Sequence, residues 1–287
     1  MHFDTDGVYT LLYTAEDECG NTTTEEREVL VANPRTVLYT DGTLIINEQP
    51  RDMARNIALH GAATNVYVAF DPNGSTSTER YEFSTQSSRP WNSVASSIKA
   101  VEIGSNISAR RTAYWFYGFT TCTSIDLTNL DSSNVSLMER MFYDCRVLTT
   151  LDLSSFNTSS VTNMSSMFSA CSALTPLDLS NFDTSSVTDM SEMFSACRAL
   201  TTLDLSNFNT SSVTDMEKMF DTCNLLNTIY ASANFVVTQV TNSSAMFYGA
   251  TALVGGAGTV YNATYLDKTY AHIDGGTADP GYFTAKS

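Results

Sequence analysis

Positive charge is scarce in this 287-residue chain, which has 15 lysines and arginines against 31 aspartates and glutamates and a formal net charge of −16. A nucleic-acid-binding protein needs a basic stripe to neutralise phosphates, so the deficit argues against nucleic acid as a partner. It argues equally against an anionic membrane surface. Charged residues make up only 16% of the chain. Together with abundant serine, threonine and asparagine, this indicates an exported protein with a neutral, polar surface.

Long apolar runs are also missing. No run approaches the roughly 20 residues that a membrane-spanning helix needs, so membrane insertion is not expected. The first residues, MHFDTDGVYT, show no basic region followed by an apolar one, and the last, GYFTAKS, carry no anchor signal. We therefore expect no signal peptide. A protein of this kind that works outside a cell would be cut from a longer chain or exported by another route.

Motifs for catalysis and metal binding are absent from the sequence. The three histidines, His2, His60 and His272, lie in different segments, and no motif connects them. The chain contains no GxSxG motif and no CxxC pair. Gly255–Gly258 lacks the lysine and Ser/Thr of a phosphate loop, so it is interpreted as a turn. The sequence therefore predicts no enzymatic activity, no cofactor and no metal site.

A unit of 26 residues is repeated along the middle of the chain. Three clean copies run from Leu148 to Ala173, from Leu174 to Ala199 and from Leu200 to Leu225. Looser copies span Cys122–Val147 and Leu226–Ala252, the latter with one inserted residue. A fixed period of this length is typical of solenoids, in which each repeat buries its apolar face only against its neighbours.

The apolar pattern inside each copy predicts how a coil is built. The motif LxxLxL, as in residues 148–153, predicts a short strand whose leucines face inward. Phe156 and Val161 follow, and the methionines and phenylalanine of residues 164–168 have the i, i+3, i+4 spacing of a short helical turn. The expected fold class is mostly β with short helical turns. It is a leucine-rich-repeat solenoid of about five 26-residue coils with β caps at both ends.

Four of the six cysteines recur with the repeat, at Cys145, Cys171, Cys197 and Cys223. Equivalent residues of stacked coils lie about 4.8 Å apart, whereas the Cβ atoms of a disulfide lie nearer 3.8 Å. We therefore expect buried, free thiols that serve as small apolar filler.

Four segments follow from these patterns. Residues 1–33 form a partial β-hairpin, residues 34–105 a β-rich N-terminal cap, residues 106–252 the solenoid and residues 253–287 a C-terminal β cap. A hairpin is interpreted for the last segment because glycines and Pro280-Gly281 divide it.

The two N-terminal segments carry several strand signals. In the first, Val8–Thr14 and Thr22–Val31 flank a turn at Glu18–Asn21. In the second, Asp41-Gly42 divides a hairpin, because Asp-Gly suits a two-residue turn. Further strands are expected at Val66–Phe70, Arg80–Phe83 and Ile98–Ile103, with a loop at Asp71–Gly74 and a buried aromatic anchor at Pro90-Trp91.

One polar row suggests a binding surface. The leucines of each LDL strand face inward, so the aspartate between them faces outward, and Asp126, Asp152, Asp178 and Asp204 should form a row. Like charges about 5 Å apart repel by roughly 0.8 kcal/mol in water. Nearby serines and backbone amides could offset this. Alternatively the row faces a basic or polyhydroxylated ligand, or binds calcium, although one carboxylate per coil makes a poor calcium cage.

Two other polar rows have local explanations. Asn157, Asp183 and Asn209 begin a turn and are expected to bond their own backbone. Asn163, Asp189 and Asp215 are expected to cap the short helical turns that follow them.

The units LDLSNFNTSSVTDM, each followed by MF and then C, resemble the BspA-like leucine-rich repeats of bacterial surface proteins, also called the 26-residue surface-protein repeat. The sequences VLYTDGTLIIN, AYWFYGF and the segment from Leu253 are similar to the flanks of that family, so the resemblance covers about residues 35–287. The segment from Asp6 to Val31 resembles the last two strands of a bacterial immunoglobulin-like repeat, with Tyr9 near its tyrosine corner.

The resemblance implies extracellular adhesion to host proteins, other bacteria or matrix. We therefore expect a non-enzymatic module on a bacterial surface that recognises a cell-surface protein or glycan through the solenoid face or cap loops. An alternative is a bacteriophage virion protein (tail fibre, tail tip or capsid decoration) with a receptor-binding or purely structural role. The missing export and anchor signals favour this alternative, which implies a possible homotrimer. A spacer without a ligand is a further alternative. A hydrolase that uses the solenoid as a carbohydrate cleft is disfavoured, because it would need paired carboxylates at a site that breaks the repeat, and the acidic residues follow the period.

Overall fold

The computed structural model describes the backbone of residues 7–16, 22–31, 35–48, 63–68, 91–104 and 107–286, with Leu59, Thr85, Ser87 and Arg89. This part of the chain is mainly β. Its named elements are β1 to β12 and a few short 3₁₀ helices. Within these residues, no helix has the length and apolar character that crossing a bilayer requires.

The N-terminal hairpin is present as predicted. β1 (Gly7–Glu16) pairs antiparallel with β2 (Thr22–Val31), with Gly7 opposite Val31 and Glu16 opposite Thr22. The turn expected at Glu18–Asn21 lies outside the described residues.

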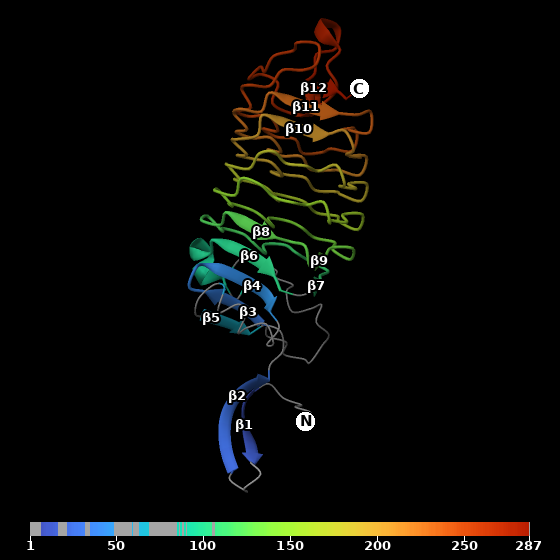
Figure 1. Ribbon diagram of the computed structural model, residues 1–287. Helices are drawn as coiled ribbons and strands as arrows, with labels where there is room; N and C mark the ends of the chain where they lie inside the picture. Colours follow the sequence, from blue (N-terminus) through green and yellow to red (C-terminus); the bar gives the residue numbers. More distant parts are fainter. Residues whose placement is uncertain are drawn as a thin grey trace.

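A five-stranded sheet precedes the repeats and continues into them. Its order is β5-β3-β4-β6-β8. The pairs β4–β6 and β6–β8 are parallel, so the first repeat strand extends the N-terminal sheet directly (Figure 1). The bounds are β3 (Arg35–Tyr39), β4 (Thr43–Glu48), β5 (Ala63–Val68), β6 (Ala100–Ile103) and β8 (Ser124–Asp126).

Local contacts explain the first of these connections. Gly42 adopts a φ of 94°, and its N–H donates to the carbonyl of Tyr39 over 3.1 Å. The Asp41 carboxylate accepts from the N–H of Thr43 at 2.8 Å. The Asp-Gly hairpin is therefore confirmed, since glycine adopts a positive φ without the steric penalty of a Cβ.

Some of the other elements predicted for residues 34–105 are confirmed, and the rest lie outside the described residues. β5 and β6 confirm strands close to the predicted 66–70 and 98–103. Trp91 is fully buried, and its indole N–H donates to the carbonyl of Trp115 at 3.1 Å. The strand expected at residues 80–83, the loop at 71–74 and Pro90 lie outside the described residues.

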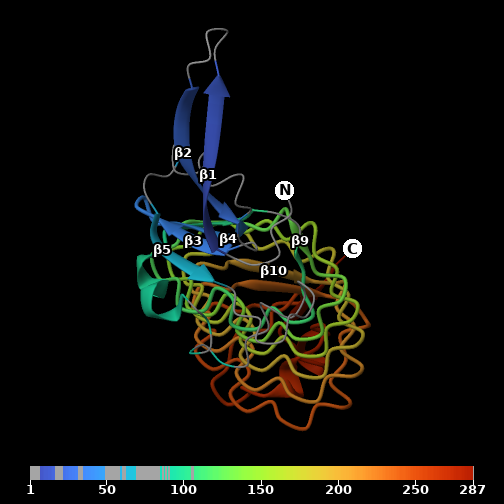
Figure 2. The same ribbon diagram turned by 90° about the horizontal axis from the view of Figure 1, so that it is seen from below.

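Successive repeats stack on one another in parallel register. Figures 1 and 2 show the chain from β8 onward winding in similar turns. Isolated parallel bridges connect one position of each copy to the next, in the series Arg111, Leu137, Asn163, Asp189, Asp215 and Asn242. Strand pairs extend this ladder: β7 (Ile107–Ser108) with β9 (Leu130–Asp131), and β10 (Thr202–Leu205) with β11 (Thr228–Ala231).

The strand predicted at each LxxLxL motif forms only in some copies. β8, β10 and β11 occupy it in the copies that begin at residues 122, 200 and 226. The copies that begin at residues 148 and 174 form no regular ladder there, although their leucines are buried in the same way. Inward packing of the leucines, rather than strand pairing, is therefore the feature that all copies share.

The core is a set of side-chain ladders that run along the stack. The repeated leucines, phenylalanines, valines, methionines and cysteines are all buried. Phenylalanines stack face to face from coil to coil: the ring centroids of Phe142 and Phe168 are 5.7 Å apart, and those of Phe168 and Phe194 are 5.9 Å apart. The ladder continues through Phe220 to Phe247. The inward pattern read from the repeat is confirmed.

The short helical turns predicted at the Met-Met-Phe trios are wrong. The N–H of Met141 donates to the carbonyl of Met138, three residues back, but the N–H of Phe142 donates to Met167 of the next coil. Along the segment, N–H groups alternate between an acceptor three residues back in the same coil and an acceptor in the next coil. Carbonyls of the neighbouring coil thus replace the i−4 acceptors of an α-helix. The segment is a run of tight turns that still points its apolar side chains inward.

Each of these turns holds residues in the left-handed region. One row of the repeat includes Arg140 at 54° and Glu192 at 55°, and a second row includes Asp144 at 64° and Ala196 at 57°. At its two ends the second row has glycine instead, at Gly118 and Gly249. A side chain with a Cβ costs roughly 1 kcal/mol or more in this conformation. The non-glycine copies therefore carry strain that the stacking overcomes.

Replacing Ala196 with glycine is expected to raise the free energy of unfolding by about 1 kcal/mol, because glycine removes the left-handed penalty. The control is Ala199→Gly in the same coil, where φ is not positive and glycine only adds entropy to the unfolded chain. That variant should be less stable than the parent. Urea denaturation of both variants measures the difference. If both lose stability equally, the left-handed strain at Ala196 is refuted.

The C-terminal segment closes the stack with a parallel strand. β12 (Phe283–Ala285) pairs with β11, Phe283 opposite Ile229, and extends the order to β10-β11-β12. Two 3₁₀ helices, η4 (Lys268–Tyr270) and η5 (Gly276–Ala278), precede it. A single antiparallel bridge joins Val254 to Val260. The β-hairpin predicted here is corrected, because the last strand finds its partner in the final repeat.

Candidate functional site

The structure places the four predicted aspartates in one row along the strand side of the coils. Asp126, Asp152 and Asp178 are exposed and Asp204 is partly exposed. A cleft of 230 Å³ is lined by both Asp126 and Asp152, and a second of 130 Å³ by both Asp152 and Asp178. These shared clefts show that residues 26 positions apart are neighbours. We call the four residues the aspartate row.

Local donors hold each carboxylate of the aspartate row. The N–H of Ser154 donates to Asp152 and that of Ser180 to Asp178, both at 2.9 Å. The hydroxyl and N–H of these serines hold the pKa of Asp152 and of Asp178 below its usual value. This matches the interpretation in which serines and amides offset the repulsion.

The two ends of the aspartate row have further partners. At Asp126, Thr128 donates its N–H over 2.9 Å and its hydroxyl over 2.6 Å. At the other end Asp204 forms an ion pair with Lys286 beside β12. Burial raises the pKa of Asp204, but Lys286 and Ser206 outweigh it and the net shift is downward.

The two other polar rows act on their own backbone as predicted. Asn157 accepts from the N–H of Ser159 at 3.1 Å and Asp183 from that of Ser185 at 3.0 Å. In the second row, Asn163 accepts from Ser165 at 2.8 Å and Asp189 from Ser191 at 2.9 Å. The second row caps tight turns rather than helices. Asn209 and Asp215 make the equivalent bonds.

A group of tyrosines departs from the repeat on the turn side of the first two coils. Tyr117 and Tyr143 stack with their ring centroids 4.6 Å apart and their planes within 5°. Arg140 lies 5.9 Å from the ring centroid of Tyr114 and donates to its hydroxyl over 3.3 Å. Burial raises the pKa of Tyr117. These four side chains, with Thr85 and Glu192, line a cleft of 400 Å³ that we call the tyrosine cleft.

The sequence carries a signal for the tyrosine cleft, because Tyr143 departs from the residues that the repeat has at its position. The copies after Tyr143 have Ser169 and Ser195 at the equivalent position. All three cleft tyrosines are partly exposed. They therefore do not belong to the buried ladders, and their bulk is not explained by the core.

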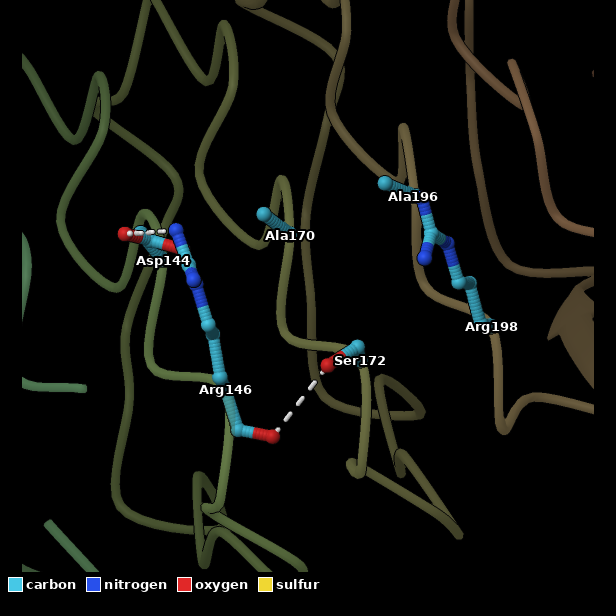
Figure 3. A pocket seen from close by; sticks show the side chains of 6 residues that line it. All are labelled: Asp144, Arg146, Ala170, Ser172, Ala196 and Arg198. Atoms are coloured by element: carbon cyan, nitrogen blue, oxygen red, sulfur yellow. Dashed lines mark hydrogen bonds and ion pairs between the residues drawn. The ribbon is translucent and has the colours of Figure 1, made fainter. Parts of the chain in front are cut away.

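A second hollow on the turn side lies between two arginines. Asp144, Arg146, Ala170, Ser172, Ala196 and Arg198 line a groove of 310 Å³, which we call the arginine groove. In Figure 3 the two arginine side chains extend in the same general direction, with Ala170 and Ser172 between them. Arg146 pairs with Asp144, whose Oδ2 lies 3.1 Å from Nη2.

The repeat family is identified by its match to the stacked coils. The family described as "Mycoplasma protein of unknown function, DUF285" matches residues 110–203 and 177–264, which together span more than half of the 287 residues. The chain belongs to this family. The DUF285 match covers the coils that carry the aspartate row, the tyrosine cleft and the arginine groove. No curated protein and no solved structure matches the chain.

Buried threonines connect the DUF285 coils in a way that periodicity alone did not reveal. The hydroxyl of Thr184 donates to the carbonyl of Asn209 at 3.0 Å and accepts from the N–H of the same residue at 2.9 Å. Thr158 and Thr210 repeat this two-way bridge to the next coil. The signal was the invariable threonine in NTSS and DTSS. In the sequence this threonine stands beside serines, so the pattern alone does not distinguish a buried bridge from an exposed turn residue.

The described cysteines are free and buried, as predicted. Each thiol of the ladder donates to a carbonyl of the preceding coil, for example Cys171 to Phe142 at 3.0 Å. Burial raises the pKa of Cys223 to about 12 and that of Cys122 to about 11. These two thiols therefore stay protonated at neutral pH and are poor nucleophiles. Cys19 lies outside the described residues.

The described part of the DUF285 chain offers no constellation for metal chemistry. No group of three or more His, Cys, Asp or Glu side chains that could hold a metal ion occurs within it. His272 lies 3.2 Å from Asp279 in the C-terminal segment, while His2 and His60 fall outside the described residues.

Proposed function

We propose that this chain is a non-enzymatic binding module that works outside the cell and recognises a cell-surface protein or glycan. In this proposal the DUF285 repeats are BspA-like leucine-rich repeats, and their stack is a solenoid of about five coils. Parallel bridges at a 26-residue spacing and the continuous phenylalanine ladder support the solenoid. Among the described residues, the repeated leucines, phenylalanines, valines, methionines and cysteines are buried, so the polar rows and the departures from the repeat are the candidate surfaces for contact with a partner.

The tyrosine cleft is the observation that carries the proposal. Partly exposed aromatic side chains outside the core favour an interaction site, because an aromatic face gives large contact area with little loss of rotamer freedom. Tyr117 and Tyr143 present a stacked pair beside the cationic Arg140. Sugar rings pack against such faces, and peptide side chains do so as well. The aspartate row is a second candidate surface for a basic or polyhydroxylated partner.

Replacing both Tyr117 and Tyr143 with alanine should weaken binding of the full chain to host or bacterial cells about tenfold or more, since central aromatic residues contribute over 1 kcal/mol each. Binding is measured with labelled protein on cells and on immobilised glycans and matrix proteins. The control is Tyr248→Ala, at the equivalent position of the last copy and 56% exposed. Equal binding by both variants and the parent would contradict the proposal.

The alternative is a bacteriophage virion protein, and the N-terminal hairpin is the observation that favours it. Among the described residues, β1 and β2 pair only with each other. An isolated hairpin is marginally stable in water, so a partner chain would complete it. It is also compatible with the end of an immunoglobulin-like domain. Light scattering of the chain with and without residues 1–33 separates the two: a trimer that dissociates on truncation supports the virion protein, and two monomers count against it.

A further inference from the structure

We propose that the arginine groove binds an anionic polysaccharide, with acid groups on alternate sugars held by Arg146 and Arg198. The proposal rests on the extracellular binding function proposed above, but it concerns a different surface from the tyrosine cleft. The ligand chemistry is a carboxylate or a sulfate carried on an extended sugar chain.

The first argument is the position of Arg146 and Arg198 in the repeat. They occupy the same position of two copies that are two coils apart, while the equivalent positions in the neighbouring copies are Ser172 and Asn224. In a chain with twice as many acidic as basic residues, two arginines at one hollow form a local concentration of positive charge. Guanidinium groups bind carboxylate and sulfate-like oxygens through paired, charge-assisted hydrogen bonds.

The second argument is the spacing. The stacked rings of these same coils are 5.7 and 5.9 Å apart, so equivalent atoms two coils apart lie roughly 10–12 Å apart. In an extended polysaccharide, the length that each sugar adds to the chain is close to the distance between neighbouring coils. Acid groups on alternate sugars would then reach both arginines. A small anion such as phosphate would reach one arginine and leave the other free.

The third argument is the floor of the groove, which favours a sugar chain over an acidic peptide. Ala170, Ser172 and Ala196 are small and leave no deep pocket for a peptide side chain. The N–H of Ala170 donates to Ser195 and that of Ala196 to Asp221 of the next coil. Since these amides are occupied, a peptide could not pair with the backbone as an added strand.

The surrounding charges are compatible with this ligand. Asp144 already pairs with Arg146, whose side chain is 63% exposed, and a guanidinium has five N–H donors, so Arg146 keeps donors for a second acid group. Arg198 has no ion pair among the described residues. The other negative charges of the chain repel an anionic polysaccharide, but at physiological ionic strength salt screens this repulsion beyond a Debye length of about 8 Å.

The test uses the full chain on a biosensor with four probes: heparin for sulfate, polygalacturonate for carboxylate, polyglutamate for an acidic peptide and dextran as the neutral chain. We expect binding to heparin, to polygalacturonate or to both, and weaker binding at higher salt. R146A/R198A should weaken it about tenfold or more, because both variant positions lose their charge-assisted hydrogen bonds to the acid groups. R110A, a change at an exposed arginine outside the groove, should leave it unchanged.

Three outcomes would overturn the proposal: no binding to either polysaccharide, equal binding by R146A/R198A and the parent, or binding of polyglutamate as tight as that of the polysaccharides. The last would assign the groove to an acidic protein. Sulfate and carboxylate sources are distinguished by the first two probes. The variant with alanine at Tyr117 and Tyr143 distinguishes failure of this proposal from failure of the proposed function. If that variant loses cell binding while the folded parent binds neither polysaccharide, only the assignment of the arginine groove is wrong.

Discussion

Replacing Phe194 with alanine is expected to lower the free energy of unfolding by about 3–5 kcal/mol, the usual cost of removing a buried aromatic side chain. Phe194 is fully buried and lies between Phe168 and Phe220, each with its ring centroid 5.9 Å away. A coil of this stack cannot bury its core alone, so a cavity at this ring weakens contacts with the coils on both sides. Denaturant titration followed by circular dichroism measures the loss.

The control is Tyr248→Ala, which removes an aromatic ring that is 56% exposed on the last copy. That change should cost well under 1 kcal/mol, as is usual for surface substitutions. Equal losses in the two variants would show that the phenylalanine ladder contributes nothing beyond ordinary surface contacts. A loss confined to the C-terminal half, seen by hydrogen exchange, would show that the stack unfolds in parts.

Replacing Asp274 with alanine is expected to lower the free energy of unfolding by about 3 kcal/mol, because it removes the common acceptor of several partly buried donors at once. Asp274 is 8% exposed. Its carboxylate accepts from the N–H of Ala257 at 2.8 Å, from the N–H of Thr259 at 2.9 Å and from the N–H of Gly276 at 2.9 Å. The hydroxyl of Thr259 donates at 2.7 Å. One carboxylate thus connects the segment after the last repeat to the segment before β12.

The matched control is Asp267→Ala. Asp267 caps η4 by accepting from the N–H of Thr269 at 2.9 Å, and it is exposed. Losing one exposed cap costs about 1 kcal/mol. Hydrogen exchange of residues 253–286, measured beside denaturant titration, should report faster exchange in the Asp274 variant only. Similar stabilities of the two variants would refute the role of Asp274 as the anchor of this segment.

The same carboxylate predicts a dependence of stability on pH. Burial raises the pKa of Asp274, but the donors from Thr259, Gly276 and Gly281 outweigh burial and hold the pKa well below its usual value. A carboxyl whose pKa is lower in the folded state binds protons more readily when unfolded. Its stabilisation is therefore complete above about pH 5 and is lost as the pH falls through the unfolded value near 3.9 toward the folded one. In the Asp274→Asn variant, the free energy of unfolding should depend less on pH over this acid range than in the parent.

The repeat unit allowed much of the coil to be predicted, because its period alone decides which residues become neighbours. Phe156, Val161 and the Met-Met-Phe trio are buried where the pattern puts them. The aspartate row also lies where alternation along the LDL segment predicts. Its binding role stays a prediction. The tyrosine cleft could have been noticed from the sequence, since it stands out only by departing from the copies around it.

Other features could not be read from the pattern, because spacing does not say where a backbone N–H finds its acceptor. An i, i+3, i+4 series fits a helix and a run of tight turns equally well, and the neighbouring coil decided the outcome by offering its carbonyls to residues such as Phe142. The C-terminal glycines suggested a hairpin, but Phe283–Ala285 instead pairs as a parallel strand with the edge of β11.

The sequence by itself determined the 26-residue period, the inward side of each coil and the buried thiols, since these depend only on which residue types recur. Tertiary structure decided which surfaces exist between coils. Arg146 and Arg198 are 52 residues apart and look unrelated in the chain. Only parallel stacking at a fixed rise brings them to the two sides of one groove. Neighbours across coils are set by how backbones stack, and no single copy of the repeat contains that information.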